Sequence, residues 1–173
     1  MSRHSLQSEE RDTAETVRSG MSWGIKQSFN RYVDAMPDGQ RGAGAGATAM
    51  PDGTFFFELH EATDYEPATG LGTVKYQGDV RYKAHGGVLF VMIVDPWLEF
   101  TEDGAQLTVV DAQHWPDRER RMVLADLEPS SHSGLPPGWA CLQARITAAG
   151  SEVFNNVYAP GDLLDPVRYS YTS

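Results

Sequence analysis

The sequence contains one cysteine, Cys141, among its 173 residues, and this scarcity excludes several kinds of site. A single thiol cannot form an internal disulfide. It also cannot build a zinc or iron–sulfur centre that depends on several cysteines. Because Cys141 lies in the apolar run WACLQARI, we expect a buried and unreactive side chain.

Long apolar segments are absent as well. The run GVLFVMIV (87–94) is shorter than the roughly 18 apolar residues that mark a membrane-spanning helix, and it predicts a buried strand instead. The first 20 residues are polar and charged, without the apolar stretch of a secretion signal. We therefore expect a cytoplasmic protein without a membrane span.

Basic residues are few, since 14 Lys and Arg stand against 24 Asp and Glu and give a net charge of −10. This balance argues against non-specific binding of nucleic acid and against docking on an anionic membrane surface. No HExxH, G-x-S-x-G or phosphate-loop pattern occurs, and no strand precedes the GAGAGA stretch as a dinucleotide fingerprint requires. We therefore predict that the protein is not an enzyme.

The chain is organised as a polar tail followed by one domain. Residues 1–19 are charged and without periodicity, which is typical of a disordered or loosely held tail. Residues 20–173 fit a single globular domain, because the whole chain is 40% hydrophobic and long enough to bury a core.

A helix is predicted at the start of this domain. Ser22 is the expected N-cap, and Pro37-Asp38-Gly39 is the expected end. The glycine-rich stretch at 39–50 is predicted to be a loop without regular structure. The apolar residues of the helix recur at a spacing that builds one face: Ile25, Phe29, Tyr32, Val33 and Met36.

From residue 54 onward the sequence has the pattern of short strands. Within 72–85 apolar and polar residues alternate strictly, with Val74, Tyr76, Val80, Tyr82 and Ala84 on one face. Short strands behind one leading helix favour a mainly β fold, an antiparallel β-sandwich or open barrel with the N-terminal α-helix packed on it. The further predicted strands are 54–59, 88–94, 105–112, 121–127, 139–148 and 167–172.

Several residues could carry chemistry, although each has an ordinary structural explanation. Tyr32 on an apolar helix face is most often a core tyrosine with a bonded hydroxyl. His85 shares the strand face of Arg81 and Lys83, which is typical of solvent exposure. Tyr158 precedes a turn that it could simply hold in place.

The remaining histidines carry weaker signals. His60, with Glu58 and Asp64, is a weak candidate for metal binding, because acidic loops are usually solvated surface. The other histidines lie in turn-rich loops or in the tail.

Three separated segments change this interpretation: MSWGIKQSFNRYV (21–33), KAHGGVLFVMIVDPW (83–97) and VYAPGDLLDPV (157–167). Taken together and in order, they resemble the HtaA family, the haem-binding domains of bacterial haem uptake. The resemblance covers roughly residues 20–170, the size of one domain. Familiar members of the family are secreted or surface-anchored, and some carry two copies of the domain, whereas this chain carries one.

The resemblance implies a ferric haem b site. It makes Tyr32, in the pattern SFNRY, the axial ligand of the haem iron, and a phenolate is a hard anionic donor that suits Fe(III). It makes His85, in the pattern HGG, the hydrogen-bonding partner of that tyrosine, and it assigns Tyr158 a supporting role. Phe29 and Trp97 are candidates to pack on a porphyrin face, and core packing explains them equally well.

We therefore predict a haem-binding protein that serves haem transport, transfer or storage. The predicted partners are haem and another haem-binding protein as donor or acceptor, and a homodimer is a candidate assembly. The alternative is an intracellular enzyme that uses the same pocket for haem-dependent chemistry or for a small hydrophobic substrate.

Overall fold

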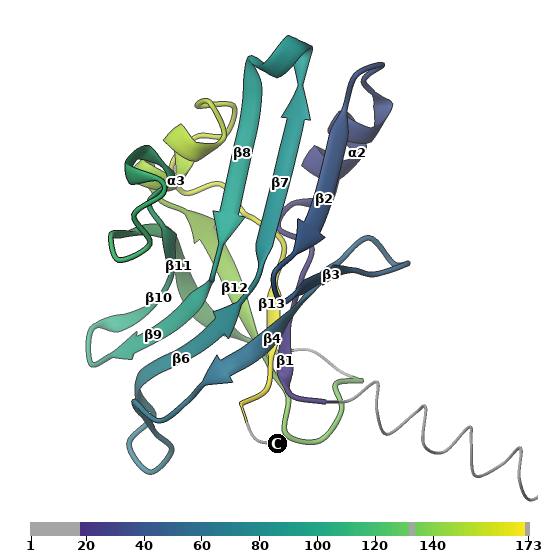
Figure 1. The fold of residues 1–173 in the computed structure, drawn as a ribbon. Helices are drawn as coiled ribbons and strands as arrows, with labels where there is room; N and C mark the ends of the chain where they lie inside the picture. The colour runs from purple at the N-terminus through teal and green to yellow at the C-terminus, as the bar shows by residue number, and fades with distance from the viewer. Residues whose placement is uncertain (1–17, 132–133, 172–173) are drawn as a thin grey trace, which may run out of the picture.

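An antiparallel ring of eight strands forms the body of the molecule in the computed structural model, which describes residues 18–131 and 134–171 (Figure 1). The ring closes because β4 pairs with β6 as well as with β1. In order around the ring, its strands are β1 (Gly20–Trp23), β4 (Phe55–Glu61), β6 (Leu71–Gln77), β9 (Trp97–Thr101), β10 (Gly104–Val110), β11 (Arg121–Ser130), β12 (Ala140–Ile146) and β13 (Val167–Tyr169). Two short strands pair on its rim, β3 (Ala47–Ala49) with β4 and β5 (Tyr65–Glu66) with β6.

A second antiparallel sheet extends from this barrel. Its strand order is β2 (Gln40–Gly44), β7 (Asp79–Ala84) and β8 (Leu89–Val94). β7 continues from β6 after Gly78, and β8 leads back toward β9, so the two sheets share one long hairpin (Figure 1). The 3-10 turn η1 (His85–Gly87) forms the tip of that hairpin.

Two short α-helices and a second 3-10 turn complete the fold of residues 18–131 and 134–171. α2 (Gln27–Ala35) lies against the sheet of β2 and β7, at the same end of the molecule as η1 (Figure 1). α3 (Ala148–Val153) follows β12, and η2 (Ala112–His114) follows β10. Among the helices of the described residues, none is long and apolar enough to cross a membrane.

The core confirms the predicted alternation along residues 74–84. Val74, Tyr76, Val80, Tyr82 and Ala84 all have no exposed surface, although Gly78 divides the predicted strand into β6 and β7. The mainly antiparallel β fold with an N-terminal helix is confirmed, and the barrel is closed rather than open. Cys141 is buried, as predicted.

The predicted start of the helix is wrong. Ser22 lies in β1, because the backbone around it pairs with β4 on one side and β13 on the other. The helix begins at Gln27, whose N–H donates to the Asp165 carboxylate at 3.1 Å. A side chain from far along the chain therefore does the capping that local sequence assigned to Ser22.

The predicted loop at 39–50 is also wrong in part. Its residues form β2 and β3, with the turn between them at Ala45 and Gly46, both at positive φ. β2 is an edge strand, and its backbone pairs with β7. Pairing through the backbone does not depend on side-chain size, so small residues that suggest a loop can form an edge strand.

Candidate functional site

The tyrosine of α2 and the histidine of η1 meet at one end of the molecule. Tyr32 Oη lies 2.8 Å from His85 Nε2, and the two rings are tilted at 52° with centroids 6.0 Å apart. Tyr32 is 50% exposed, and His85 is exposed as well. Which atom donates depends on the tautomer of His85 and on whether Tyr32 keeps its proton.

The orientation of Tyr32 follows from the way α2 is anchored. Phe29 and Val33 are buried, which turns Tyr32 outward. Asn30 on the buried side accepts a hydrogen bond from the Tyr82 hydroxyl at 2.6 Å and donates to the Gly24 carbonyl at 2.9 Å. These bonds fix the rotation of the helix against β7, and burial raises the pKa of Tyr82 so that its hydroxyl remains a donor.

His85 is placed by an unusual backbone turn. Its φ is 55°, and the two glycines that follow have φ values of 65° and 93°. Three successive left-handed residues reverse the chain sharply, and glycine adopts this region without a steric penalty. The Asp38 carboxylate accepts hydrogen bonds from the backbone N–H groups of His85 and Gly86.

Tyr158 lies beside the first turn of α2. Its ring is half-buried. The ring centroid of Tyr158 lies 6.2 Å from that of Phe29 and 5.7 Å from that of Phe154. Burial raises the pKa of Tyr158, and a hydrogen bond with the Ser28 side chain opposes that rise. Ser28 and Tyr32 are four residues apart, so they share a face of the helix, and the three predicted residues border one surface.

Phe29 supports this surface from beneath. Only 2% of its area is exposed, and its ring packs edge-on against Tyr82, Phe154 and Tyr158. A direct contact of Phe29 with a porphyrin therefore stays a prediction, while its packing role is evident. The structure does not bring Trp97 to this group, because Trp97 lies on β9 with the Arg121 guanidinium 3.6 Å from its ring.

Four residues of this region were not predicted from the sequence as part of the site. Val88, next to the HGG turn, is 82% exposed, and Val157, next to Tyr158, is 63% exposed. Lys26 lies with its Nζ 5.1 Å from the Tyr158 ring centroid and donates to the Leu163 carbonyl at 2.8 Å. Asp38 is the fourth, through its hydrogen bonds to the backbone of His85 and Gly86.

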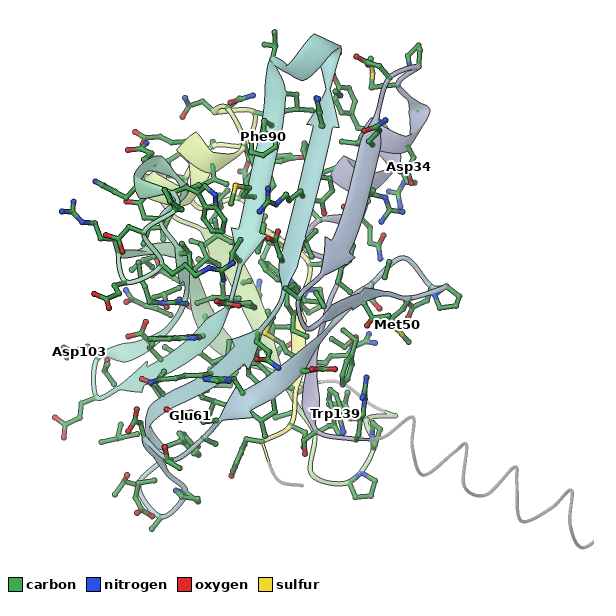
Figure 2. All side chains as sticks on the ribbon, in the orientation of Figure 1. Asp34, Met50, Glu61, Phe90, Asp103 and Trp139 are labelled. Carbon is green, nitrogen blue, oxygen red and sulfur yellow. The ribbon has the colours of Figure 1, made fainter. Side chains whose placement is uncertain are left out.

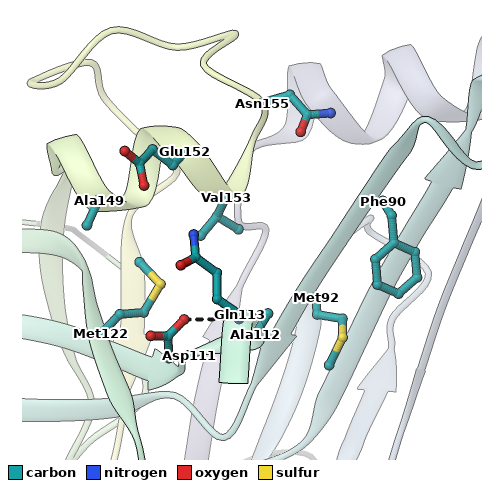
Figure 3. Close-up of a pocket in the computed structure, with 10 residues that line it drawn as sticks. All are labelled: Phe90, Met92, Asp111, Ala112, Gln113, Met122, Ala149, Glu152, Val153 and Asn155. Carbon is teal, nitrogen blue, oxygen red and sulfur yellow. Dashed lines mark hydrogen bonds between the residues drawn. The ribbon is translucent and has the colours of Figure 1, made fainter. Parts of the chain in front are cut away.

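A separate cleft of about 340 Å³ lies between β8, η2 and α3 (Figure 3). Phe90 and Met92 line it from β8, and Glu152 and Val153 line it from α3. Phe90 is 46% exposed on the outer face of its sheet (Figure 2). The Asp111 carboxylate at its edge accepts from the Gln113 N–H at 3.1 Å.

A metal site at His60 receives no support within residues 18–131 and 134–171. No group of three or more His, Cys, Asp or Glu side chains there could hold a metal ion. The neighbouring carboxylates have other partners, since Glu58 accepts from Gln77 and Asp64 pairs with Lys75.

Comparisons with known proteins identify the family. The family model HtaA, described as Htaa, matches residues 18–170. The chain therefore belongs to the HtaA family. Among curated protein sequences, none matches this chain.

Three solved structures from Corynebacterium glutamicum share the fold. The C-terminal domain of HtaA superposes with a TM-score of 0.71 at 21% identity, over 87% of this chain and 93% of that domain. The N-terminal domain of HtaA gives a TM-score of 0.63 at 24% identity, over 90% of this chain and 97% of that domain. The heme binding protein HtaB gives 0.61 at 18% identity, over 87% of this chain and 90% of that protein.

Proposed function

We propose that this chain binds ferric haem b, with the Tyr32 phenolate as the axial ligand of the iron. The observation that carries the proposal is the exposed Tyr32–His85 pair, in which an oxygen ligand already has a hydrogen-bonding partner at 2.8 Å. Membership of the HtaA family supports it, and a protein of the same fold, HtaB, is named as a heme binding protein.

The chemistry of the pair fits a ferric porphyrin. A tyrosine is a known haem ligand, but its phenol must lose a proton whose ordinary pKa is about 10. In the free protein, the Tyr32 hydroxyl donates to His85 Nε2 when that nitrogen is unprotonated. Once Tyr32 has lost its proton, the same nitrogen must carry a hydrogen and donate to the phenolate, so His85 would hold the ligand in its charged form.

The surroundings of the pair also fit this cofactor. A porphyrin offers a flat apolar face, and exposed apolar area is available at Val88, next to the HGG turn, and at Val157, next to Tyr158. Haem b also carries two propionates. Lys26 supplies a cation for one of them, because its ammonium contacts a carbonyl and an aromatic ring rather than a carboxylate.

The exposure of both residues supports a role in holding and passing on haem. A ligand tyrosine that is half exposed leaves one side of the site open to another haem-binding protein, as a donor or an acceptor. We therefore propose transport, transfer or storage of haem rather than its chemical use.

A titration with hemin tests the proposal. The wild-type protein should show a saturable Soret change at about one hemin per chain, as expected for a single axial site. Tyr32→Phe removes the oxygen that would bind the iron and keeps the ring, so it should lose most of the affinity for hemin. Tyr65→Phe is the matched control, since Tyr65 packs on Phe100 and Tyr171 away from the site. Equal affinity of Tyr32→Phe and the wild type would overturn the proposal.

A further inference from the structure

We infer that Asp38 is the positioning residue of the Tyr32–His85 pair: its carboxylate ties the turn that carries the histidine to the end of the helix that carries the tyrosine. The inference rests on the proposed function for its consequence in haem binding. Its structural part concerns only the free protein.

The contact joins two segments that are far apart in sequence. Asp38 Oδ2 accepts from the Gly86 N–H at 2.7 Å, and Asp38 Oδ1 accepts from the His85 N–H at 3.2 Å. Both carboxylate oxygens are therefore used on successive backbone donors. Consecutive N–H groups in a turn of this kind form a concave anion-binding nest, and here a side chain of the same chain fills it.

The other end of the contact is fixed by the helix. Asp38 lies three residues beyond the end of α2 at Ala35, and the Gly39 N–H donates to the Met36 carbonyl at 3.1 Å. A Cβ at position 39 would come within 1.8 Å of the Val33 carbonyl oxygen, so the chain passes close against the last turn of the helix. The backbone of Asp38 is therefore held in a fixed relation to α2, and so to Tyr32.

The turn at His85 needs such a restraint. His85 has a φ of 55°, a region that few residues with a side chain adopt and that costs conformational energy unless other contacts hold it. Its side chain is exposed, so core packing does not hold it. Of the contacts described for the tip, the Val88 N–H to His85 carbonyl bond is internal to the turn and does not connect it to α2.

The charge of Asp38 suits this role. The backbone donors of Gly86 and then His85 lower the pKa of Asp38 below its ordinary value of 3.8. The carboxylate is therefore ionised at neutral pH and accepts with both oxygens. A charged acceptor makes shorter and stronger hydrogen bonds than a neutral one, which fits the 2.7 Å contact with Gly86.

The test compares Asp38→Ala with Asp34→Ala. Asp34 is the matched control because it is also an exposed carboxylate near the end of α2, where it ties the helix to β2 through two bonds to Arg41 (Figure 2). Asp38→Asn is a milder variant, since its amide keeps one acceptor oxygen for the turn. Each variant is first compared with the wild type by its backbone amide spectrum, to establish that the fold is retained.

The first readout is the ring nitrogen spectrum of His85 in the haem-free protein. Tyr32→Phe supplies the Nε2 shift of a His85 without its tyrosine partner. Asp38→Ala should move the Nε2 signal toward that reference, Asp38→Asn should move it less, and Asp34→Ala should leave it unchanged. A His85 signal in Asp38→Ala that matches the wild type would overturn the inference.

The second readout is hemin affinity. Loss of a partner that orients a metal-binding pair commonly costs 10–100-fold, so Asp38→Ala should bind hemin about tenfold more weakly or worse. Affinity equal to that of Asp34→Ala would contradict the inference. If instead Tyr32→Phe binds hemin like the wild type, the proposed function fails, while the His85 spectrum still decides the role of Asp38.

Discussion

Tyr32 Oη and His85 Nε2 lie 2.8 Å apart although 53 residues separate them in the chain. The contact exists because α2 packs against β7, through Phe29 and Asn30 on Tyr82, and because the tip of the β7–β8 hairpin lies at the same end of the molecule as α2 (Figure 1). Both side chains remain exposed, so the pair is accessible from solvent although the backbone segments that carry it are packed. Under the proposed function, Tyr32 would bind the iron with its hydrogen-bonding partner already in place.

Removing the histidine should weaken haem binding without abolishing it. His85→Ala leaves the Tyr32 oxygen but takes away the donor that would stabilise its phenolate, and such losses are commonly 10–100-fold. His114→Ala is the control, because His114 is also exposed and its ring Nδ1 lies 3.0 Å from the Asp111 carboxylate, in the η2 region. Hemin titration of both variants checks this, and wild-type affinity in His85→Ala would remove the histidine from the site.

Reduction of the iron should weaken the complex. An anionic oxygen donor stabilises Fe(III) over Fe(II), and Tyr32 would be such a donor. Addition of dithionite to the hemin complex should therefore shift haem to a competing apoprotein that binds ferrous haem. A ferrous complex as tight as the ferric one would show that another residue takes the iron.

The anchoring of α2 can be tested through Asp165, whose carboxylate accepts from the Gln27 N–H at the start of the helix. Asp165→Ala removes this cap and should lower the free energy of unfolding by about 1 kcal/mol, within the usual range of roughly 0.5–2 kcal/mol. Urea unfolding measures the change. Asp126→Ala on β11 should have a smaller effect, since Asp126 is exposed and has only a 3.5 Å contact with Gln106.

The protein should lose stability at alkaline pH. Burial raises the pKa of Tyr169 to about 12 and also raises the pKa of Tyr76 and Tyr82. An unfolded tyrosine ionises at about pH 10, so the fold favours the neutral form, and this contribution is complete below pH 10 and declines as the pH rises above it. Urea unfolding measured from about pH 8 to about pH 11 should show this decline in the free energy of unfolding, and Tyr169→Phe should make the decline shallower.

The strand content of the fold could be predicted because it depends on local pattern. In residues 74–84 apolar and polar side chains alternate in the sequence, and the apolar ones are those that the core buries. The apolar run at 88–94 forms β8 from Leu89 onward. The start of the helix could not be predicted, because β4, β13 and Asp165 decide it from distant parts of the chain. The closure of the barrel is equally non-local, since it depends on the pairing of β4 with β6.

The candidate site divides in the same way. Tyr32, His85 and Tyr158 were identified by resemblance to the HtaA family. The structure brings Tyr32 to His85 and packs Tyr158 on Phe29 of the same helix. Asp38 was identified in the sequence only as part of a helix-ending turn, since its contact with the HGG segment crosses 48 residues. Val88 was assigned to a buried strand, but β8 begins one residue later.

The most direct test of the account is the resonance Raman spectrum of the ferric hemin complex, excited in the region of phenolate-to-iron charge transfer. If Tyr32 is the ligand, the wild type should show vibrations of an iron-bound tyrosinate, and Tyr32→Phe should lack them at equal hemin concentration. Tyrosinate vibrations that persist in Tyr32→Phe, or that are absent from a saturated wild-type complex, would contradict the account.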